Sequence, residues 1–182
     1  LEIHSLTFLS DDNIVAGYNQ GLITSFNFKS GQQLKSLEFE RKHHKSMVED
    51  LELSPSGKIL AAAHYFDIQL IEVESFEVTK KMPHTSWVWS CDFSSNGEII
   101  ATGCQDGSIN LWDTTKSDQL QTIHGHSMTV GSVNFFPKGK GVMSSSNDGT
   151  LKAWQLDSKR SDQKFGIRGG LKSTAITKDK KI

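Results

Sequence analysis

The chain alternates short apolar runs with turns rich in Gly, Asn, Asp and Ser along its whole length, which predicts many short β-strands. The predicted strands recur as a repeat. The runs that align as the first strand of each unit end 40 to 45 positions apart, at Phe8, Leu53, Phe93, Phe135 and Ile176. Self-similarity at a fixed period of this length is typical of repeat architectures.

A second landmark, the bulky residue at the end of the third predicted strand, keeps the same period. It stands at Phe26, Ile71, Trp112 and Trp154, at intervals of 45, 41 and 42 residues. Two landmarks in register predict units of about four strands, the pattern of β-propeller blades. We expect a single incomplete propeller domain over 1–182, with repeats at approximately 1–40, 41–82, 83–123 and 124–165, and a partial repeat at 166–182.

Residues 106–113 (DGSINLWD) and 148–155 (DGTLKAWQ) are similar, and a histidine stands 28 residues before the Trp of each segment. At these residues the chain resembles the WD-repeat family. The resemblance implies an all-β, WD-type β-propeller that is partial here, with four four-stranded blades and the inner strand of a fifth.

The same resemblance implies a buried hydrogen-bond network in each of these two repeats. The residues that match its positions are His84, Thr102, Asp106 and Trp112 in one repeat and His126, Ser144, Asp148 and Trp154 in the next. A buried Trp needs an acceptor for its indole N–H, and an Asp in a tight turn needs donors. A catalytic interpretation of these His, Asp and Ser residues is disfavoured because they recur at a repeated position.

The first two repeats depart from this pattern. The aligned positions hold Ala16, Gln20 and Phe26 in the first repeat and Ala62 and Ile71 in the second, where the turn Asp is missing. We expect these two blades to rely on packing alone.

The repeats do not complete a ring. A seven-bladed ring, the usual size in the family, would need about 294 residues at this period. Three explanations stay open: a fragment of a longer protein or complex, a ring completed by a second chain, or a four-bladed closure. Without closure, both ends of the repeat array would leave blade faces and strand edges open.

A binding surface is expected where the entry to each first strand and the turn between second and third strands meet, because loops on a rigid scaffold carry binding. Residues 85–91 resemble the corresponding entry strand of heterotrimeric G-protein beta subunits, whose matching positions face the partner. The alternative is that Trp87 packs against the neighbouring blade. The expected partner-binding residues are Tyr18, Met47, Glu49, Tyr65, Trp87, Trp89, Thr129 and Lys172.

Composition narrows the partners. A net charge of −1, from 20 basic and 21 acidic side chains, gives no general attraction to nucleic acid, and only three of the basic residues are Arg. Cys91 and Cys104 fit neither a disulfide framework nor a zinc pair, which favours a reducing intracellular compartment. We expect the cytoplasm rather than the nucleus. No apolar run is long enough for a membrane span. The basic cluster 41–45 is interpreted as a solvated loop, with a weak, salt-sensitive anion contact as the alternative.

Catalytic and cofactor motifs were also sought. The His pairs lack the further ligands that a metal needs, and no phosphate-binding loop or nucleophile elbow is present. We therefore expect no metal, no cofactor and no catalytic residue. Thr115 and Asp157 stand where related cullin-ligase receptors carry Arg, which disfavours that role.

The sequence thus predicts a non-catalytic scaffold that binds other proteins or peptides. Two alternatives remain. One is a regulatory or sensor propeller appended to an enzyme or ATPase in a longer chain, and the other is a component of a ribonucleoprotein assembly.

Overall fold

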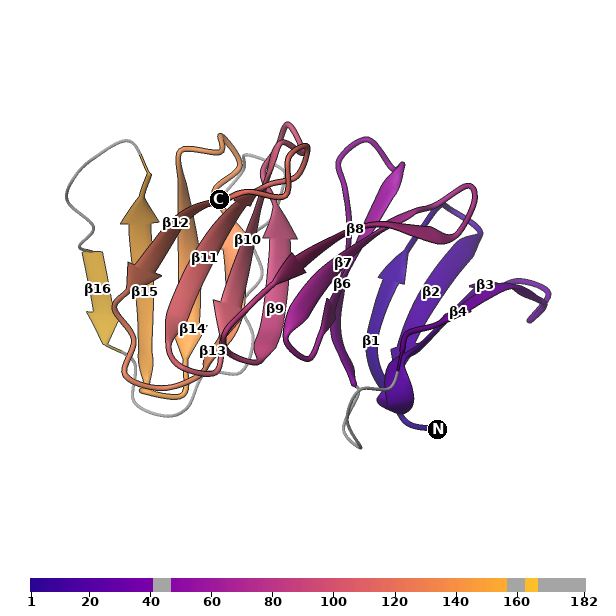
Figure 1. The fold of residues 1–182 in the computed structure, drawn as a ribbon, viewed down its shortest axis with the longest axis horizontal. Coiled ribbons are helices and arrows are strands. Elements are labelled where there is room, and N and C mark those ends of the chain that lie inside the picture. The colour runs from indigo at the N-terminus through magenta and orange to yellow at the C-terminus, as the bar shows by residue number, and fades with distance from the viewer. Residues whose placement is uncertain (41–46, 157–162, 167–182) are drawn as a thin grey trace. The chain divides into compact units, whose positions relative to one another are not determined.

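A computed structural model describes residues 1–40, 47–156 and 163–166, and this part of the chain is all-β, without an α-helix. Its strands form four antiparallel sheets of four strands each, in which every strand pairs with its neighbour in the sequence (Figure 1). Each sheet therefore has the order of a propeller blade, and the landmark residues of the four described repeats fall on first and third strands as the period predicts. No helix in the described ranges is long and apolar enough to cross a membrane.

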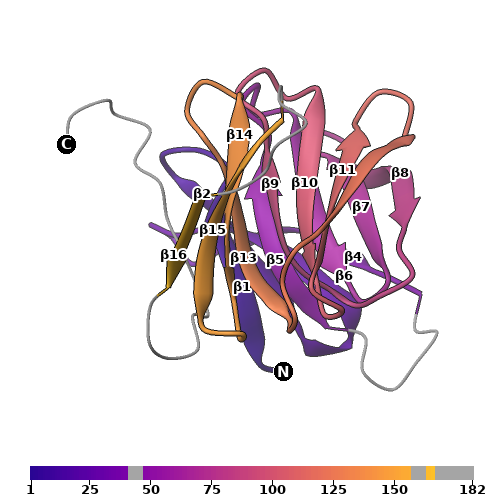
Figure 2. The same cartoon turned by 90° about the vertical axis from the view of Figure 1, so that its left-hand side faces the viewer.

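The chain divides into two compact units, Leu1–Val88 and Trp89–Ile182, with two sheets in each. The first sheet contains β1 (Ile3–Phe8), β2 (Asn13–Tyr18), β3 (Leu22–Asn27) and β4 (Gln33–Glu38), with a short 3-10 turn, η1 (Asn19–Gly21), after β2. The second contains β5 (Val48–Leu53), β6 (Ile59–His64), β7 (Asp67–Glu72) and β8 (Glu77–Pro83). The third contains β9 (Val88–Phe93), β10 (Ile99–Cys104), β11 (Ser108–Asp113) and β12 (Gln119–His124). The fourth contains β13 (Val130–Phe135), β14 (Gly141–Ser146), β15 (Thr150–Gln155) and β16 (Gln163–Gly166), and its strands can be followed in Figure 2.

In the first unit the two sheets bury a common core against each other. Gly17 on β2 makes this approach possible, because a Cβ there would lie 2.6 Å from the Val48 side chain. Beside it, the Ser5 hydroxyl donates to the Val48 carbonyl over 2.9 Å. The buried members of this core are Val15, Ile23, Phe39, Val48, Leu51, Leu60, Ala62, Ile71 and Phe76.

The second unit repeats this contact between its own two sheets. Gly103 on β10 stands where Gly17 stands on β2, and a Cβ there would lie 2.7 Å from the Val130 side chain. The backbone N–H of Phe135 also donates to the Asp92 carboxylate of the neighbouring sheet over 2.5 Å. The buried members of this core are Ala101, Ile109, Leu111, Ile123, Val130, Val133, Phe135, Val142 and Trp154.

The antiparallel order brings two kinds of loop to one end of each sheet. The start of the first strand lies beside the turn between the second and third strands, as the pairing of Ile3 with Tyr18 and of Val130 with Ser146 demonstrates. We call this end of a sheet its entry end. The expected partial repeat at 166–182 lies outside the described residues.

Candidate functional site

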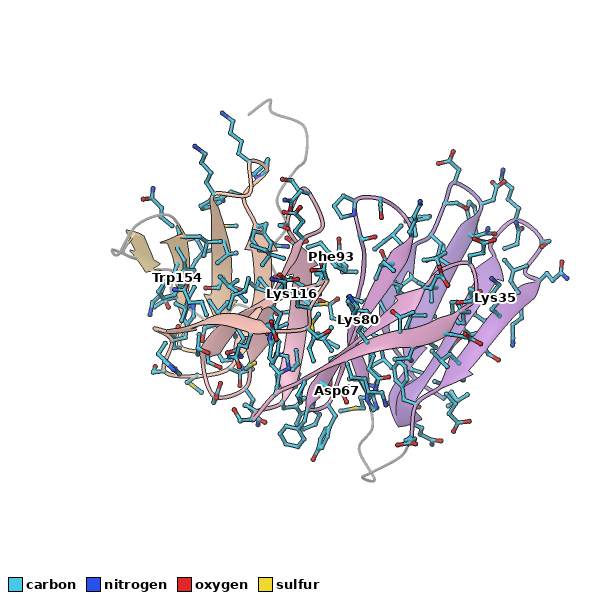
Figure 3. The ribbon with its side chains drawn as sticks, turned by 45° about the horizontal axis from the view of Figure 1, so that its top comes forward. Lys35, Asp67, Lys80, Phe93, Lys116 and Trp154 are labelled. Carbon is cyan, nitrogen blue, oxygen red and sulfur yellow. The ribbon has the colours of Figure 1, made fainter. Side chains whose placement is uncertain are left out.

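The fourth sheet brings together the four polar residues expected for its repeat. His126, in the segment before β13, places Nδ1 2.9 Å from the Asp148 carboxylate and Nε2 2.8 Å from Ser144 Oγ. The indole N–H of Trp154 donates to the same Ser144 oxygen over 2.7 Å. Figure 3 labels Trp154, whose ring is 4% exposed and lies edge-on to His126. The network joins β14, the turn after it and β15 to the segment that enters the sheet.

One arrangement of the hydrogens satisfies every group of this network with a neutral imidazole. Because Trp154 can only donate, Ser144 accepts from it and in turn donates to Nε2 of His126. Nδ1–H of His126 then donates to Asp148, so the imidazole is neutral. Gly125 is required beside this network, since a Cβ there would lie 2.1 Å from the Trp154 ring.

The electrostatics agree with a neutral His126 beside an ionised Asp148. Burial lowers the pKa of His126, and the hydrogen bond to Asp148 only partly opposes this. Burial disfavours ionisation of Asp148, but hydrogen bonds from Thr150, His126 and the backbone N–H of Ser127 together outweigh burial and lower its pKa. The carboxylate therefore acts as the fixed acceptor at the end of the network.

Ser144, His126 and Asp148 have the connectivity of a catalytic triad, yet their surroundings prevent that chemistry. Ser144 is 0% exposed, so its oxygen cannot reach a substrate. That oxygen is already occupied by the Trp154 N–H and by His126. A nucleophile must reach the reacting atom of the substrate, and this hydroxyl instead joins two strands.

Acid is expected to weaken the fold through His126. The folded state keeps this imidazole neutral, whereas the unfolded chain binds a proton near pH 6.5. The contribution is therefore complete above about pH 6.5 and declines as the pH falls below it, by less than about 1.4 kcal/mol per pH unit. Asp148 contributes no change in this range, because its stabilisation is lost only as the pH falls from about 3.9 through its lowered folded pKa.

Urea unfolding at pH 7.5, 6.5 and 5.5 would measure this dependence. We expect a smaller loss of unfolding free energy between pH 7.5 and 5.5 in His126→Gln than in the unmodified chain. His124→Gln, at an exposed histidine, is the matched control. Equal slopes for the unmodified chain and His126→Gln would contradict the assignment.

The matching set of the third repeat is divided between the two units. Asp106 accepts from the backbone N–H of Ser108 at 3.0 Å and from its hydroxyl at 2.6 Å, and Thr102 Oγ1 lies 3.4 Å from the Asn110 carbonyl. Trp112 is 5% exposed in the same unit. His84 belongs to the first unit, where its Nδ1 lies 2.9 Å from the carbonyl of Met82. For this repeat the four-residue network stays a prediction.

The second sheet corrects the expectation that the first two blades rely on packing alone. His64, at the end of β6, has a buried side chain whose Nδ1 lies 3.6 Å from Asp67 and 3.5 Å from Gln69. Gln69 also donates to Asp67 over 3.1 Å, and the imidazole lies 4.8 Å from the Phe39 ring. This sheet therefore holds a polar cluster of its own, beside a β6–β7 connection of two residues where the other described sheets have three.

Five of the expected partner-binding residues lie at the entry ends of the first unit. Tyr18 ends β2, Met47 precedes β5 and Glu49 lies within β5, while Tyr65 follows β6 and Trp87 precedes β9. All five side chains are partly exposed. In the second unit Trp89 and Thr129 are also partly exposed, and the Thr129 hydroxyl donates to the Gln105 carbonyl over 3.3 Å. Lys172 and the basic cluster 41–45 lie outside the described residues, which include none of residues 41–46 and 167–182.

The structure brings Tyr65 and Trp87 together with a third ring, that of Phe66. The ring centroids of Tyr65 and Trp87 are 5.0 Å apart, and those of Tyr65 and Phe66 are 4.3 Å apart. The chain entering β9 runs across this turn, because the N–H groups of His84 and Val88 donate to the carbonyls of Phe66 and Tyr65. Trp87 therefore packs against the neighbouring blade, which was one of the two alternatives, and still leaves part of its ring exposed.

Tyr65 occupies a strained backbone position. Its φ is +55°, in the left-handed region that favours glycine, and the turns of the second unit use Gly107 and Gly149 at φ of +86° and +80°. A bulky residue there costs roughly 1 to 3 kcal/mol. The strained backbone position is therefore held by the residue whose ring contacts both Trp87 and Phe66.

A second feature of the entry ends is a repeated β-bulge. The pairing register shifts between Ile3 and Ser5, between Val48 and Asp50, and between Val130 and Ser132. The residues at these bulges are His4, Glu49 and Gly131. A bulge changes the direction of the side chain that it carries, and these three bulges carry three different residue types.

Several residues of these sites were not in the predicted set. Thr150 and Ser127 bind the Asp148 carboxylate, and the Asp-Gly-Thr pattern was a signal for the first of them. Phe66 is 40% exposed beside Tyr65, and its position in an aromatic turn was a signal too. The Asp67 and Gln69 pairing with His64 had no counterpart in the other repeats that could have revealed it.

The two cysteines of the chain carry no reactive thiol chemistry at Cys104 and no metal cluster among the described residues. Cys91 and Cys104 are free and buried, and burial raises the pKa of the Cys104 thiol to about 11. That thiol is therefore not a nucleophile at neutral pH. The described ranges contain no group of three or more His, Cys, Asp or Glu side chains placed to hold a metal ion.

Comparison with known families gives matches in two places. Residues 76–113 and 117–155 match the model of the WD domain, G-beta repeat. The first segment contains β8 to β11 and the second contains β12 to β15, and they include the turn Asp and the Trp of the third and fourth sheets.

Comparison with individual proteins finds relatives that match 63% to 85% of this chain. Serine-threonine kinase receptor-associated protein of Mus musculus is 25% identical over 153 residues, which are 84% of this chain and 42% of that protein. Nuclear distribution protein nudF of Emericella nidulans is 25% identical over 179 residues, covering 85% of this chain and 39% of the relative. Target of rapamycin complex subunit wat1 of Schizosaccharomyces pombe is 28% identical over 121 residues, with coverages of 63% and 37%. The chain thus spans about two fifths of the length of these relatives.

Proposed function

Because this chain belongs to the WD-repeat family, we propose that it is a non-catalytic scaffold that binds a protein or peptide at the entry ends of its blades. Two relatives support an interaction role by their names, since one is called receptor-associated and another is called a complex subunit. This chain covers about two fifths of these relatives, so protein interaction as the role of the whole protein is also part of this proposal.

The observation that carries the proposal is the aromatic cluster of Tyr65, Phe66 and Trp87. Aromatic residues that remain partly exposed on a rigid scaffold are typical of binding hot spots. Here one of them also holds an unfavourable backbone conformation that glycine would relieve. Gln20, in the equivalent turn of the first sheet, also has a positive φ, so the aromatic side chain rather than the backbone conformation alone distinguishes Tyr65.

The test measures binding with substitutions that preserve the fold. Partners would be captured with the chain as bait, identified by mass spectrometry and measured individually by isothermal titration calorimetry. We expect Trp87→Ala and Tyr65→Gly each to weaken binding of a captured partner by roughly 30-fold or more, as loss of a hot spot does. Tyr65→Gly is the sharper variant, because it removes the ring while it relieves the positive φ.

Phe28→Ala is the matched control for these variants. Phe28 is 46% exposed and follows β3 at the opposite end of the first sheet, so its loss removes an exposed ring away from the cluster. Its affinity is expected to equal that of the unmodified chain. Full affinity in both Trp87→Ala and Tyr65→Gly would contradict binding at this end.

A further inference from the structure

We propose that Glu49 and the rings of Tyr65 and Trp87, which lie at the same strand end, form a site for a cationic side chain, arginine or lysine, of the partner protein. The proposal rests on the proposed function, because it names the chemistry recognised at the same entry end.

The position of Glu49 is the first step. It is the bulge residue of β5, since Val48 pairs with His64 and Asp50 pairs with Ala63 while Glu49 lies between them. This register places Glu49 beside the end of β6, where Tyr65 follows His64 directly. The bulge therefore presents the carboxylate at the same strand end as the aromatic cluster.

The second step is the state of the Glu49 carboxylate. Its Oε1 atom is buried and has no hydrogen-bond partner among the described residues. Burial raises the pKa of Glu49, nearby His4 lowers it, and adjacent Asp50 raises it. A carboxylate oxygen buried without a partner is costly. Because the Glu49 side chain as a whole is partly exposed, a change of its rotamer would let a cationic donor from another molecule remove that cost.

The distribution of charge in the first unit is the third step. At its entry ends the described charged residues are mostly acidic, and Glu2, Glu49, Asp50 and Asp67 are among them. The described lysines lie elsewhere: Lys29, Lys35 and Lys58 are at the opposite end, and Lys80 and Lys81 are on the outer strand β8. Asp67, Lys35 and Lys80 are labelled in Figure 3. Among the described residues this end of the unit is therefore acidic, which favours a cationic ligand; Arg41, Lys42 and Lys45 lie outside those residues.

The aromatic rings narrow the choice of cation. A guanidinium group can stack on a Tyr or Trp ring and donate two parallel hydrogen bonds to a carboxylate, and a lysine can pack its stem on the rings. Arginine therefore uses both parts of the site, and we expect it to be preferred.

The experiment selects ligands without assuming a partner. A displayed library of random linear 12-residue peptides would be panned on the chain, and the enriched peptides synthesised and measured by fluorescence polarisation. We expect enriched peptides to contain arginine or lysine. Replacement of that arginine by citrulline, or Glu49→Gln in the chain, is expected to weaken binding about tenfold, and the two changes together no more than either alone.

Controls separate this inference from the proposed function. Glu77→Gln removes a charge at the opposite end of the second sheet and should leave the affinity unchanged. Peptides that bind through Trp87 but respond neither to Glu49→Gln nor to citrulline would overturn the inference and leave the proposed function intact. Acidic peptides whose binding is lost when Arg41, Lys42 and Lys45 are changed to Gln would also overturn it. Both proposals would be contradicted if no peptide were enriched, or if the enriched peptides bound Trp87→Ala and Tyr65→Gly as tightly as the unmodified chain.

Discussion

Trp154→Ala is expected to lower the free energy of unfolding by about 3 to 5 kcal/mol, the loss typical of a large aromatic residue removed from a core. The ring is 4% exposed, packs within the core of the second unit and donates to Ser144. Its removal leaves a cavity and takes one donor from the buried network that ends at Asp148. Urea denaturation followed by far-ultraviolet circular dichroism would measure the change without relying on tryptophan fluorescence.

Two further variants make the Trp154 result interpretable. Trp154→Phe keeps much of the apolar ring but lacks the indole N–H, so its loss should be smaller, about 1 to 3 kcal/mol. Phe28→Ala removes an exposed aromatic residue and should change stability by no more than about 0.5 kcal/mol. A loss below about 1 kcal/mol for Trp154→Ala would show that the hydrogen-bond network does not stabilise the second unit.

Much of the fold follows from the sequence because the determining signals are local and repeated. A strand buried on one face alternates apolar and polar residues, and the four described repeats give this alternation four times in register. The network of the fourth sheet was predictable for a similar reason. Asp148 and Trp154 stand within one hairpin at the spacing that recurs at Asp106 and Trp112, and the resemblance of both segments to the WD-repeat family implied the network.

The features that carry the binding proposals could be predicted only in part. Tyr65 and Trp87 were both expected at entry ends, but their contact joins residues far apart in the sequence and depends on how the chain crosses the β6–β7 turn. The bulge at Glu49 is a property of strand pairing, and no residue type marks it, since His4 and Gly131 hold the equivalent positions. The burial of one Glu49 oxygen depends on what surrounds the bulge, which no local pattern records.

The same reasoning explains why the first unit differs from the second. Ala62 pairs with Gln69 in the second sheet as Ser144 pairs with Lys152 in the fourth, which places Ile71 in register with Trp154. The hydroxyl that accepts the Trp N–H is therefore absent at Ala62. A buried isoleucine needs no hydrogen-bond acceptor and is therefore compatible with Ala62. The polar contacts described for this sheet lie instead at its strand end, around His64.

Ile71→Ala is accordingly expected to cost about 2 to 5 kcal/mol in unfolding free energy, because the side chain is 0% exposed within the core of the first unit. Ile71→Trp, which restores the residue found in the third and fourth repeats, should also destabilise the chain, by about 1 to 3 kcal/mol. The larger ring overfills the core, and Ala62 offers no side-chain acceptor for its N–H. Urea denaturation would measure both changes, with Ile71→Val as the control at about 0.5 to 1.5 kcal/mol. If Ile71→Trp unfolds at the same urea concentration as the unmodified chain, the missing acceptor at Ala62 is not what excludes tryptophan from this blade.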